Sequence, residues 1–218
     1  MPRILDKILS LFALLILFPF FVPIVIILLL TGEHKVFYLQ ERIGYRNQKF
    51  RIIKFATMLS NSANIGSGSL TLKNDPRVLP FGSFLRKTKI NELPQILNIL
   101  IGNLAIVGPR PQMSVDFNKY SFEIQKKIYN VRPGLTGIGS IIFRDEESLI
   151  SNAASSENPH VFYKRVIAPY KGELEMWYQD NRSISLDLKL IFMTAWVIIF
   201  PNTRLYEKWF INLPKRIF

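Results

Sequence analysis

The sequence predicts an α/β fold that is mostly helical, organised as a compact membrane-associated domain. We expect a proline-broken re-entrant helix at the N-terminus, a small β element, and amphipathic helices that lie at the membrane interface. Three observations predict this fold. Residues 8–32 carry no charge, alternating apolar and basic residues flank a turn at residues 44–48, and apolar residues recur at helical spacing through much of the remaining chain.

The composition is that of one strongly basic domain. The chain has 218 residues and a formal net charge of +12, with a pI of about 10.0. Such a balance favours a polyanionic partner, namely nucleic acid, an anionic lipid bilayer or phosphorylated substrates. The absence of cysteine excludes a disulfide scaffold and a cysteine-ligated zinc site. The two histidines lie far apart in sequence, which argues against a histidine-based metal cluster.

The uncharged run at residues 8–32 has two main interpretations. Its 25 residues as a straight helix would reach roughly 37 Å, enough to cross a bilayer core of about 30 Å. The alternative is a helix that enters the membrane, breaks and returns, and two observations favour it. Pro19 and Pro23 each remove a helical hydrogen bond near the middle of the run, and basic residues flank both ends, which places both in the cytoplasm. We therefore expect residues 1–34 to form a re-entrant membrane helix.

A single domain at the cytoplasmic face is expected over residues 35–200. Residues 36–58 predict two short strands, and the Ser-, Asn- and Gly-rich residues 59–76 predict a long loop. Helical spacing resumes over residues 77–88. A second helix is expected to begin with Asn91 as its N-cap and Glu92 as its first residue, and to end near Gly102. A short apolar strand and a rigid Gly-Pro-Arg-Pro turn at residues 108–111 follow, a pairing that suggests phosphate chemistry.

The remaining chain is expected to be mainly helical. Residues 186–200 are too short to span a membrane easily, so a core helix or a surface-lying amphipathic helix is expected there. The mixture of aromatic and basic side chains in residues 201–218 predicts an interfacial C-terminal tail. The other expected segments are a helix over 115–131, a turn over 132–137, a short strand over 139–143, a loop over 145–158, and a long helix over 159–182 bent near Pro169 and Gly172.

Five motifs follow the proline-broken hydrophobic helix in this order: FRIIKFATM, NDPRVLPFGSFLRKT, NELPQILNILIGNLAIVGPRP, RPGLTG and a C-terminal LDLKL helix. With this order of motifs, the chain resembles the bacterial sugar transferases, the monotopic polyprenol-phosphate phosphoglycosyl transferases, from about residue 3 to residue 200.

The resemblance implies an activity. Members of this family transfer a sugar-1-phosphate from a UDP-sugar to undecaprenyl phosphate, with release of UMP and with Mg²⁺ as cofactor. The reaction initiates surface polysaccharide assembly, such as capsule or lipopolysaccharide, or glycoprotein glycan assembly. It takes place at the cytoplasmic face of the bacterial inner membrane, so the resemblance implies that residues 35–200 form a catalytic domain at that face. A homo-oligomer is compatible with the sequence. Nucleic acid is not expected as a partner, because no basic helix or aromatic platform of the recognised kinds appears.

The chain departs from the family at the position of the nucleophile. The usual pair there is Asp-Glu, in which the Asp is the nucleophile and the Glu is a magnesium ligand; here the pair is Asn91–Glu92. An amide is a poor nucleophile and a poorer magnesium ligand than a carboxylate. Three interpretations stay open. Glu92 takes over as nucleophile or as metal ligand in a direct displacement; Asn91 lowers or abolishes turnover, giving an impaired binding homologue; or the alignment is shifted.

Other site residues follow from the resemblance alone. Each basic residue has the alternative of being a surface or membrane-facing charge, and Glu175, which stands where an Asp is usual, has the alternative of a solvated helix face. The substrate-binding residues that the resemblance implies are Lys54, Arg86, Arg110, Arg132, Arg144 and Glu175, beside Asn91 and Glu92 as catalytic residues and Glu92 as the metal ligand.

Overall fold

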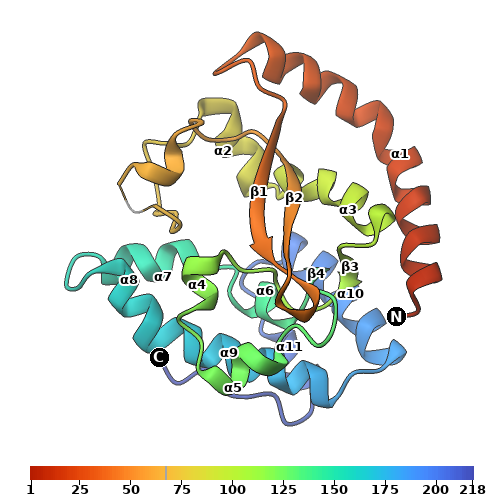
Figure 1. Ribbon diagram of the computed structural model, residues 1–218, viewed down its shortest axis with the longest axis vertical. Helices are drawn as coiled ribbons and strands as arrows, with labels where there is room; N and C mark the ends of the chain where they lie inside the picture. Colours follow the sequence, from red (N-terminus) through yellow and green to blue (C-terminus); the bar gives the residue numbers. More distant parts are fainter. Residues whose placement is uncertain (67) are drawn as a thin grey trace.

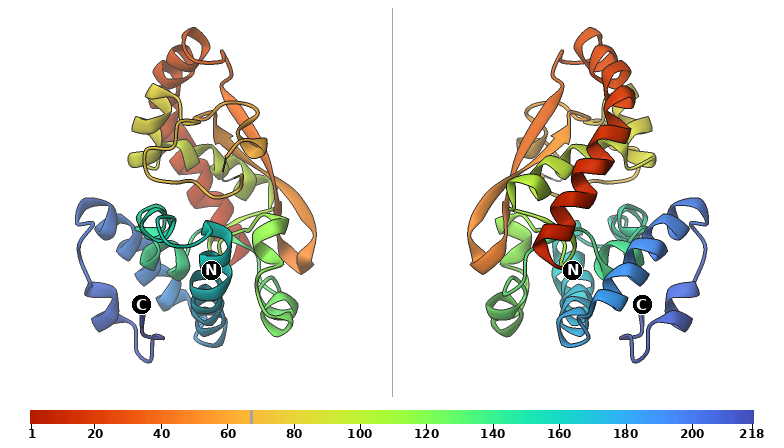
Figure 2. Two further views of the ribbon diagram at one scale, coloured as in Figure 1. Left: turned by 90° about the vertical axis from the view of Figure 1, so that its left-hand side faces the viewer. Right: turned by 90° about the vertical axis from the view of Figure 1, so that its right-hand side faces the viewer.

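We analysed a computed structural model of the chain, which describes residues 1–66 and 68–218. Ser67, within the predicted loop 59–76, lies outside the described residues. Figure 1 shows two groups of elements. The first group contains the N-terminal helix, a β-hairpin and two short helices, and the second is a cluster of short helices from the C-terminal half. The two views in Figure 2 show the N-terminal helix along the outside of the first group.

The N-terminal helix α1 spans Arg3–Leu30 without interruption. The prediction that the prolines divide it into two helices is therefore wrong. Pro19 and Pro23 lie inside the helix, which bends along its length (Figure 1). A proline in a helix removes one hydrogen bond and kinks the axis without ending the helix when the neighbouring turns persist. Among the described residues, α1 is the one helix long and apolar enough to cross a membrane, and only 6% of its most apolar window is buried. Whether it is re-entrant stays a prediction.

The predicted hairpin is confirmed. Strands β1 (Phe37–Ile43) and β2 (Lys49–Phe55) pair antiparallel around the 3₁₀ turn η1 (Tyr45–Asn47). The register pairs Tyr38 with Lys54 and Arg42 with Phe50. Because side chains alternate between the faces of a strand, Lys54 and Arg42 share one face of the hairpin.

The long loop is ordered around one buried arginine. Arg77 donates hydrogen bonds to the carbonyl oxygens of Ser62, Ile65, Gly68 and Leu70, at 2.7–2.8 Å. Its guanidinium also pairs with Asp75. The loop contains the 3₁₀ turn η2 and leads into α2, which is shorter than the helix expected over residues 77–88. The bounds are Ser62–Asn64 for η2 and Pro80–Lys87 for α2.

The helix expected from Asn91 divides into two elements. A 3₁₀ helix, η3, spans Ile90–Gln95, and the α-helix α3 spans only Ile96–Ile101. The N-cap prediction for Asn91 is wrong, since η3 follows Lys89, whose φ of 60° is left-handed, and no side chain caps it. Pro94 lacks the N–H that an α-helical bond from this position needs, which favours the tighter 3₁₀ turn before it. The expected end at Gly102 is confirmed, with a φ of 100°.

The centre of the second group contains a two-stranded parallel sheet. The expected apolar strand is β3 (Ala105–Val107), and its partner β4 (Gly134–Thr136) lies within the RPGLTG segment that was expected to be a turn. Two further expectations are wrong. Residues 139–143 are not a strand, because residues 139–142 belong to α6 (Ile138–Ile142) and Phe143 is its C-cap. Residues 145–158 are not a loop but contain α7 (Glu146–Ala153). Both helices bury apolar residues three positions apart, Ile138 with Ile141 and Ile150 with Ala153, and a strand would place the two members of each pair on opposite faces.

The helix expected over 115–131 divides because Ser121 caps a new helix, accepting a hydrogen bond from the Ile124 N–H. The long helix over 159–182 is confirmed, and its expected irregularity is a π-helical turn, η4, directly before Pro169. Residues 186–200 lie in a helix with one buried and one exposed face. The bounds are Ser114–Phe117 for α4, Phe122–Lys127 for α5, Pro159–Phe162 for α8, Tyr163–Ile167 for η4, Ala168–Asp180 for α9, Ile184–Ile199 for α10 and Leu205–Trp209 for α11.

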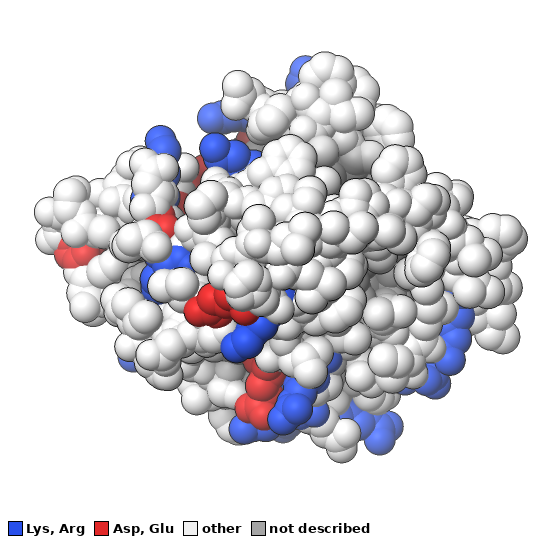
Figure 3. Space-filling model, turned by 90° about the horizontal axis from the view of Figure 1, so that it is seen from above, with Lys and Arg blue, Asp and Glu red and all other residues white. Residues whose placement is uncertain are grey.

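The C-terminal tail packs on the protein over part of its length. Phe210 is buried against Trp177, whose indole N–H donates to the Ile211 carbonyl at 3.2 Å. Ile211 and Ile217 remain exposed, so the interfacial role predicted for this tail is untested and stays a prediction. Figure 3 shows that charged side chains gather toward the left and lower edges of the face seen from above, while most of its right half is uncharged.

Candidate active site

Three elements bring one carboxylate and two cations together. Glu92 comes from η3, Lys54 from β2 and Arg110 from the loop after β3. The Arg110 guanidinium donates to both Glu92 carboxylate oxygens, at 2.9 Å and 3.4 Å. Lys54 Nζ lies 3.8 Å from Glu92 Oε1. Three residues that the sequence predicted for the site are therefore in direct contact.

Hydrogen bonds with Tyr129 and Glu175 hold the Gly-Pro-Arg-Pro loop in place. The Tyr129 hydroxyl donates to the Arg110 carbonyl and accepts from the Gln112 N–H, both at 2.8 Å. The Arg110 N–H donates to Glu175 Oε1 at 3.4 Å. Arg110 thus contacts Glu92 through its side chain and Glu175 through its main chain. Tyr129 fixes the loop that carries both contacts.

The surroundings shift the pKa values of Glu92 and Lys54 for different reasons. Burial on its own would raise the pKa of Glu92, but the charges of Arg110 and Lys54 outweigh it and hold the pKa well below 4.5. Burial lowers the pKa of Lys54 to about 7, although Glu92 opposes the shift. Glu92 is therefore an anion at every pH near neutrality, while Lys54 changes its charge close to neutral pH.

Arg42 adds another cation to the same site. Its guanidinium donates to the Pro111 carbonyl at 3.2 Å and to Gln40 Oε1. Burial and then the charge of Arg110 lower the pKa of Arg42 to about 10. The sequence analysis missed this residue, although its position on the Lys54 face of the hairpin could have identified it.

Glu175 is a buried acid of a different kind. It is only 2% exposed, and burial raises its pKa to about 8 against the opposing effects of the Arg110 N–H and Lys171. Its Oε2 has no hydrogen-bond partner. The carboxyl lies so close to α6 that a Cβ on Gly139 would approach Oε1 to 2.5 Å. Glu175 is thus mostly neutral at pH 7 and offers a donor or acceptor rather than a charge.

Asn91 is buried beside Glu92 in η3, with 5% of its surface exposed. Its Oδ1 has no hydrogen-bond partner. An unpartnered buried oxygen is costly unless a ligand or water satisfies it, and such groups gather at functional sites. The position at which the resemblance implies a nucleophile thus carries a buried acceptor without a hydrogen-bond partner among the described residues.

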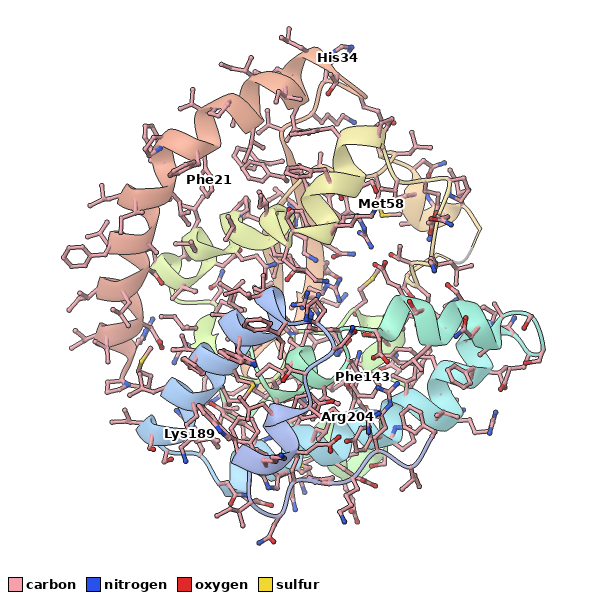
Figure 4. All side chains as sticks on the ribbon, turned by 180° about the vertical axis from the view of Figure 1, so that it is seen from behind. Phe21, His34, Met58, Phe143, Lys189 and Arg204 are labelled. Carbon is pink, nitrogen blue, oxygen red and sulfur yellow. The ribbon has the colours of Figure 1, made fainter. Side chains whose placement is uncertain are left out.

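A second group of cations lies next to η3. Arg86 pairs with Glu147 and approaches Met58 Sδ, which Figure 4 labels beside α2. Arg144 forms no ion pair within the described part of the chain. Lys89, which the sequence analysis missed, interacts electrostatically with both Glu92 and Arg144. These side chains extend the positive surface around Glu92, as phosphate binding requires.

Arg132 lies outside this cluster. Its Nε donates to the Gly102 carbonyl at 2.9 Å, and its guanidinium stacks over the Tyr45 ring, 5.0 Å from the centroid. These contacts connect the start of β4 to the end of α3 and the hairpin turn, away from Glu92. A substrate-binding role for Arg132 stays a prediction without a contact to the other site residues.

The oxygen atoms of Glu92 and Asn91 fit a magnesium site that substrate phosphates complete. Across residues 1–66 and 68–218, no three or more His, Cys, Asp or Glu side chains gather into a metal site. Mg²⁺ is commonly held by one or two carboxylates together with substrate phosphates and water. Ionised Glu92 and the free Asn91 oxygen match that mode, in which substrate phosphates complete the site.

Comparisons with known proteins identify the family to which this chain is similar. A family model described as bacterial sugar transferase matches residues 1–201. The Exopolysaccharide production protein ExoY of Sinorhizobium fredii is 30% identical over 206 residues, which cover 88% of this chain and 82% of the relative.

Two further relatives have names that state an activity. The UDP-glucose:undecaprenyl-phosphate glucose-1-phosphate transferase of Xanthomonas campestris is 32% identical, over 87% of this chain and 37% of its own length. The UDP-N-acetylgalactosamine-undecaprenyl-phosphate N-acetylgalactosaminephosphotransferase of Aeromonas hydrophila is 31% identical, over 86% of this chain and 42% of its own. The matched region thus spans less than half of these two relatives.

Proposed function

This chain belongs to the bacterial sugar transferase family, and on that premise we propose that it transfers a sugar-1-phosphate from a UDP-sugar to undecaprenyl phosphate, releasing UMP. The reaction takes place at the cytoplasmic face of the bacterial inner membrane and initiates surface polysaccharide assembly. One observation carries the proposal: the ionised Glu92 meets Arg110 and Lys54 beside an apolar, exposed helix. A phosphate site next to a membrane-binding helix suits one soluble and one lipid-linked phosphate substrate.

The residues suggest a direct displacement. An oxygen of the lipid phosphate attacks the phosphorus that carries the sugar, and the bond from that phosphorus to UMP breaks. Arg110, Lys54 and Arg42 stabilise the negative charge of the reacting phosphates. Both Glu92 oxygens already accept hydrogen bonds from Arg110, so we assign Glu92 to holding the cations that stabilise the phosphate charge rather than to nucleophilic attack.

Magnesium enters this proposal through Asn91 and Glu92. These two residues would hold the ion, which neutralises phosphate charge when it is bound. The chain's own contribution is to keep Glu92 ionised and the Asn91 oxygen free of other partners.

A UMP-release assay with a panel of UDP-sugars and undecaprenyl phosphate, with magnesium and then with chelator, tests the proposal. We expect Glu92→Gln to lower turnover by on the order of 10²–10³-fold, as removal of a group that acts on transition-state charge does. Direct displacement forms no covalent intermediate with the protein. We therefore expect the protein to stay unlabelled when it is mixed with radiolabelled UDP-sugar alone. Unchanged UMP release by Glu92→Ala would show that the site is misplaced.

An impaired homologue is the second candidate, and Asn91 favours it. An amide cannot replace a carboxylate nucleophile, and Glu92 is occupied by Arg110. This candidate predicts a silent wild-type chain that still binds UDP-sugar, while Asn91→Asp turns over and becomes covalently labelled. Asn91→Ala serves as the matched control, because it also removes the amide but supplies no carboxylate. Turnover by the wild-type chain would exclude this candidate.

A further inference from the structure

A polar cavity lies at the start of α1. Its volume is about 240 Å³, and it lies between the start of α1, the β3 strand and the corner between α9 and α10. None of Glu92, Arg110 and Lys54 lines it, so it is separate from the candidate active site. The polar side chains that line it are Arg3, Asp6, Tyr45, Asn130, Arg132, Tyr178 and Arg182.

The cavity contains an excess of positive charge. Arg3, Arg132 and Arg182 line it, and none of them forms an ion pair with a carboxylate in the described part of the chain. Two of them converge on Gly102: Arg132 Nε donates to its carbonyl at 2.9 Å, and a Cβ there would lie 2.5 Å from Arg3 Nη2. Guanidinium groups gathered without carboxylate partners are typical of phosphate recognition.

Asp6 supplies a second, independent observation. It is 6% exposed, lines the cavity, and its Oδ1 has no hydrogen-bond partner. The neighbouring Asp187 differs, because it accepts from the Tyr178 hydroxyl at 2.8 Å and pairs with the Met1 ammonium. The cavity is therefore lined by guanidinium groups that form no ion pair, and by one buried carboxylate oxygen that has no hydrogen-bond partner, among the residues that the structure describes.

We propose that this cavity binds a phosphate ester that carries a hydrogen-bond donor, with the arginines on the phosphate and Asp6 Oδ1 on the donor. The ethanolamine phosphate head group of a membrane lipid has this combination. Its acyl chains would meet the apolar surface of α1, where Ile4, Leu5 and Ile8 are exposed close to Arg3 and Asp6. This inference does not depend on the proposed transfer reaction.

Lipid retention by the full chain in detergent tests the inference. Phosphatidylethanolamine and phosphatidylcholine carry the same net charge, but only the former has a donor on its head group. We expect the wild type to retain phosphatidylethanolamine preferentially, and Arg3→Gln/Arg182→Gln to retain about tenfold less of it. Lys7→Gln/Lys189→Gln is the matched control, since it also removes two cations, one from α1 and one from α10 (Lys189 is labelled in Figure 4), and neither of them lines the cavity.

Soluble phosphoethanolamine and phosphocholine distinguish a lipid from a free phosphate ester. Thermal stabilisation by phosphoethanolamine alone would show that the phosphate chemistry suffices, and retention of the lipid alone would assign the site to the membrane. If Arg3→Gln/Arg182→Gln does not fold, Arg3→Lys/Arg182→Lys replaces it, because this second variant keeps both positive charges. We expect it to bind the phosphoethanolamine group less tightly than the wild type does. Equal losses in the control variant, or no preference between the two head groups in either assay, would overturn the proposal.

Discussion

Glu175 shows how burial changes the role of an acidic residue. The sequence places it only as an acid on a helix, with a solvated face as its alternative. The structure buries it, and its pKa of about 8 keeps it mostly neutral at pH 7. The solvated alternative is therefore wrong, and a long-range contact to the Arg110 main chain explains why no local pattern could show this.

This pKa makes a prediction about stability. The folded state holds a proton on Glu175 up to about pH 8, whereas an unfolded glutamate loses it near 4.5. Stability from this group is therefore fully present below pH 4.5 and is lost as pH rises through 8. We expect Glu175→Gln to match the wild type near pH 5 and to exceed its free energy of unfolding by on the order of a few kcal/mol at pH 9. Denaturant unfolding at both pH values checks this, and a pH-independent difference would contradict it.

At the scale of elements, the alternation of apolar and basic residues predicted the strands correctly, whereas a short apolar run did not. The hairpin was predictable because Phe50 and Ile52 alternate with basic residues around a glycine turn. The run at residues 139–143 was assigned to a strand because a short apolar segment fits both strand and helix. Only its packing against α9, with Gly139 against Glu175, determines the helix.

Arg77 makes a prediction about the loop over residues 59–76. We expect Arg77→Lys to lower the free energy of unfolding by about 1–3 kcal/mol and to speed proteolysis within the loop. A single ammonium cannot reach the carbonyls of Ser62, Ile65, Gly68 and Leu70 together, and they would lose their donors. Arg51→Lys, an equal change at an exposed position of β2, is the control. Equal proteolysis of both variants would exclude an organising role for Arg77.

The C-terminal tail makes a second prediction at this scale. Arg216 pairs with Asp145 at 3.0 Å and lies over the Phe143 ring, so it holds both neighbours of Arg144. Figure 4 places Phe143 among the helices of the C-terminal half. We expect Arg216→Ala to raise the KM for the UDP-sugar by up to about fivefold with little change in kcat, because a partly exposed ion pair contributes about 1 kcal/mol or less.

The control for this tail prediction is Arg204→Ala, because Arg204 lies in the same tail and forms no ion pair in the described part of the chain. We also expect Arg216→Lys to restore part of the lost affinity. A change in melting temperature without a change in KM would assign Arg216 to stability alone.

At the scale of the whole molecule, the sequence predicted the long apolar helix and the residues of the candidate site but not the geometry of that site. Lys54, Glu92 and Arg110 were each predicted, and they meet. Arg132 was predicted with them and lies elsewhere. A motif shows which residues a family uses, whereas the distance between two segments depends on packing that no single segment encodes.

The topology of α1 is a prediction at the same scale. Because the chain contains no cysteine, Lys7→Cys and His34→Cys give single labelling sites at the two ends of the helix. We expect a membrane-impermeant maleimide to leave both unlabelled in intact cells and to label both after permeabilisation, since both flanks are basic. Labelling of only one site in intact cells would establish a spanning helix.

The contact between Arg110 and Glu92 has one more consequence. In the resting molecule the carboxylate and the guanidinium neutralise each other. A substrate phosphate that captures Arg110 must release Glu92 from its strongest counter-ion, since Arg110 is the first of the groups that lower its pKa. Under the proposed function, binding of the donor would therefore free the carboxylate, whereas in the empty site Arg110 and Lys54 neutralise it.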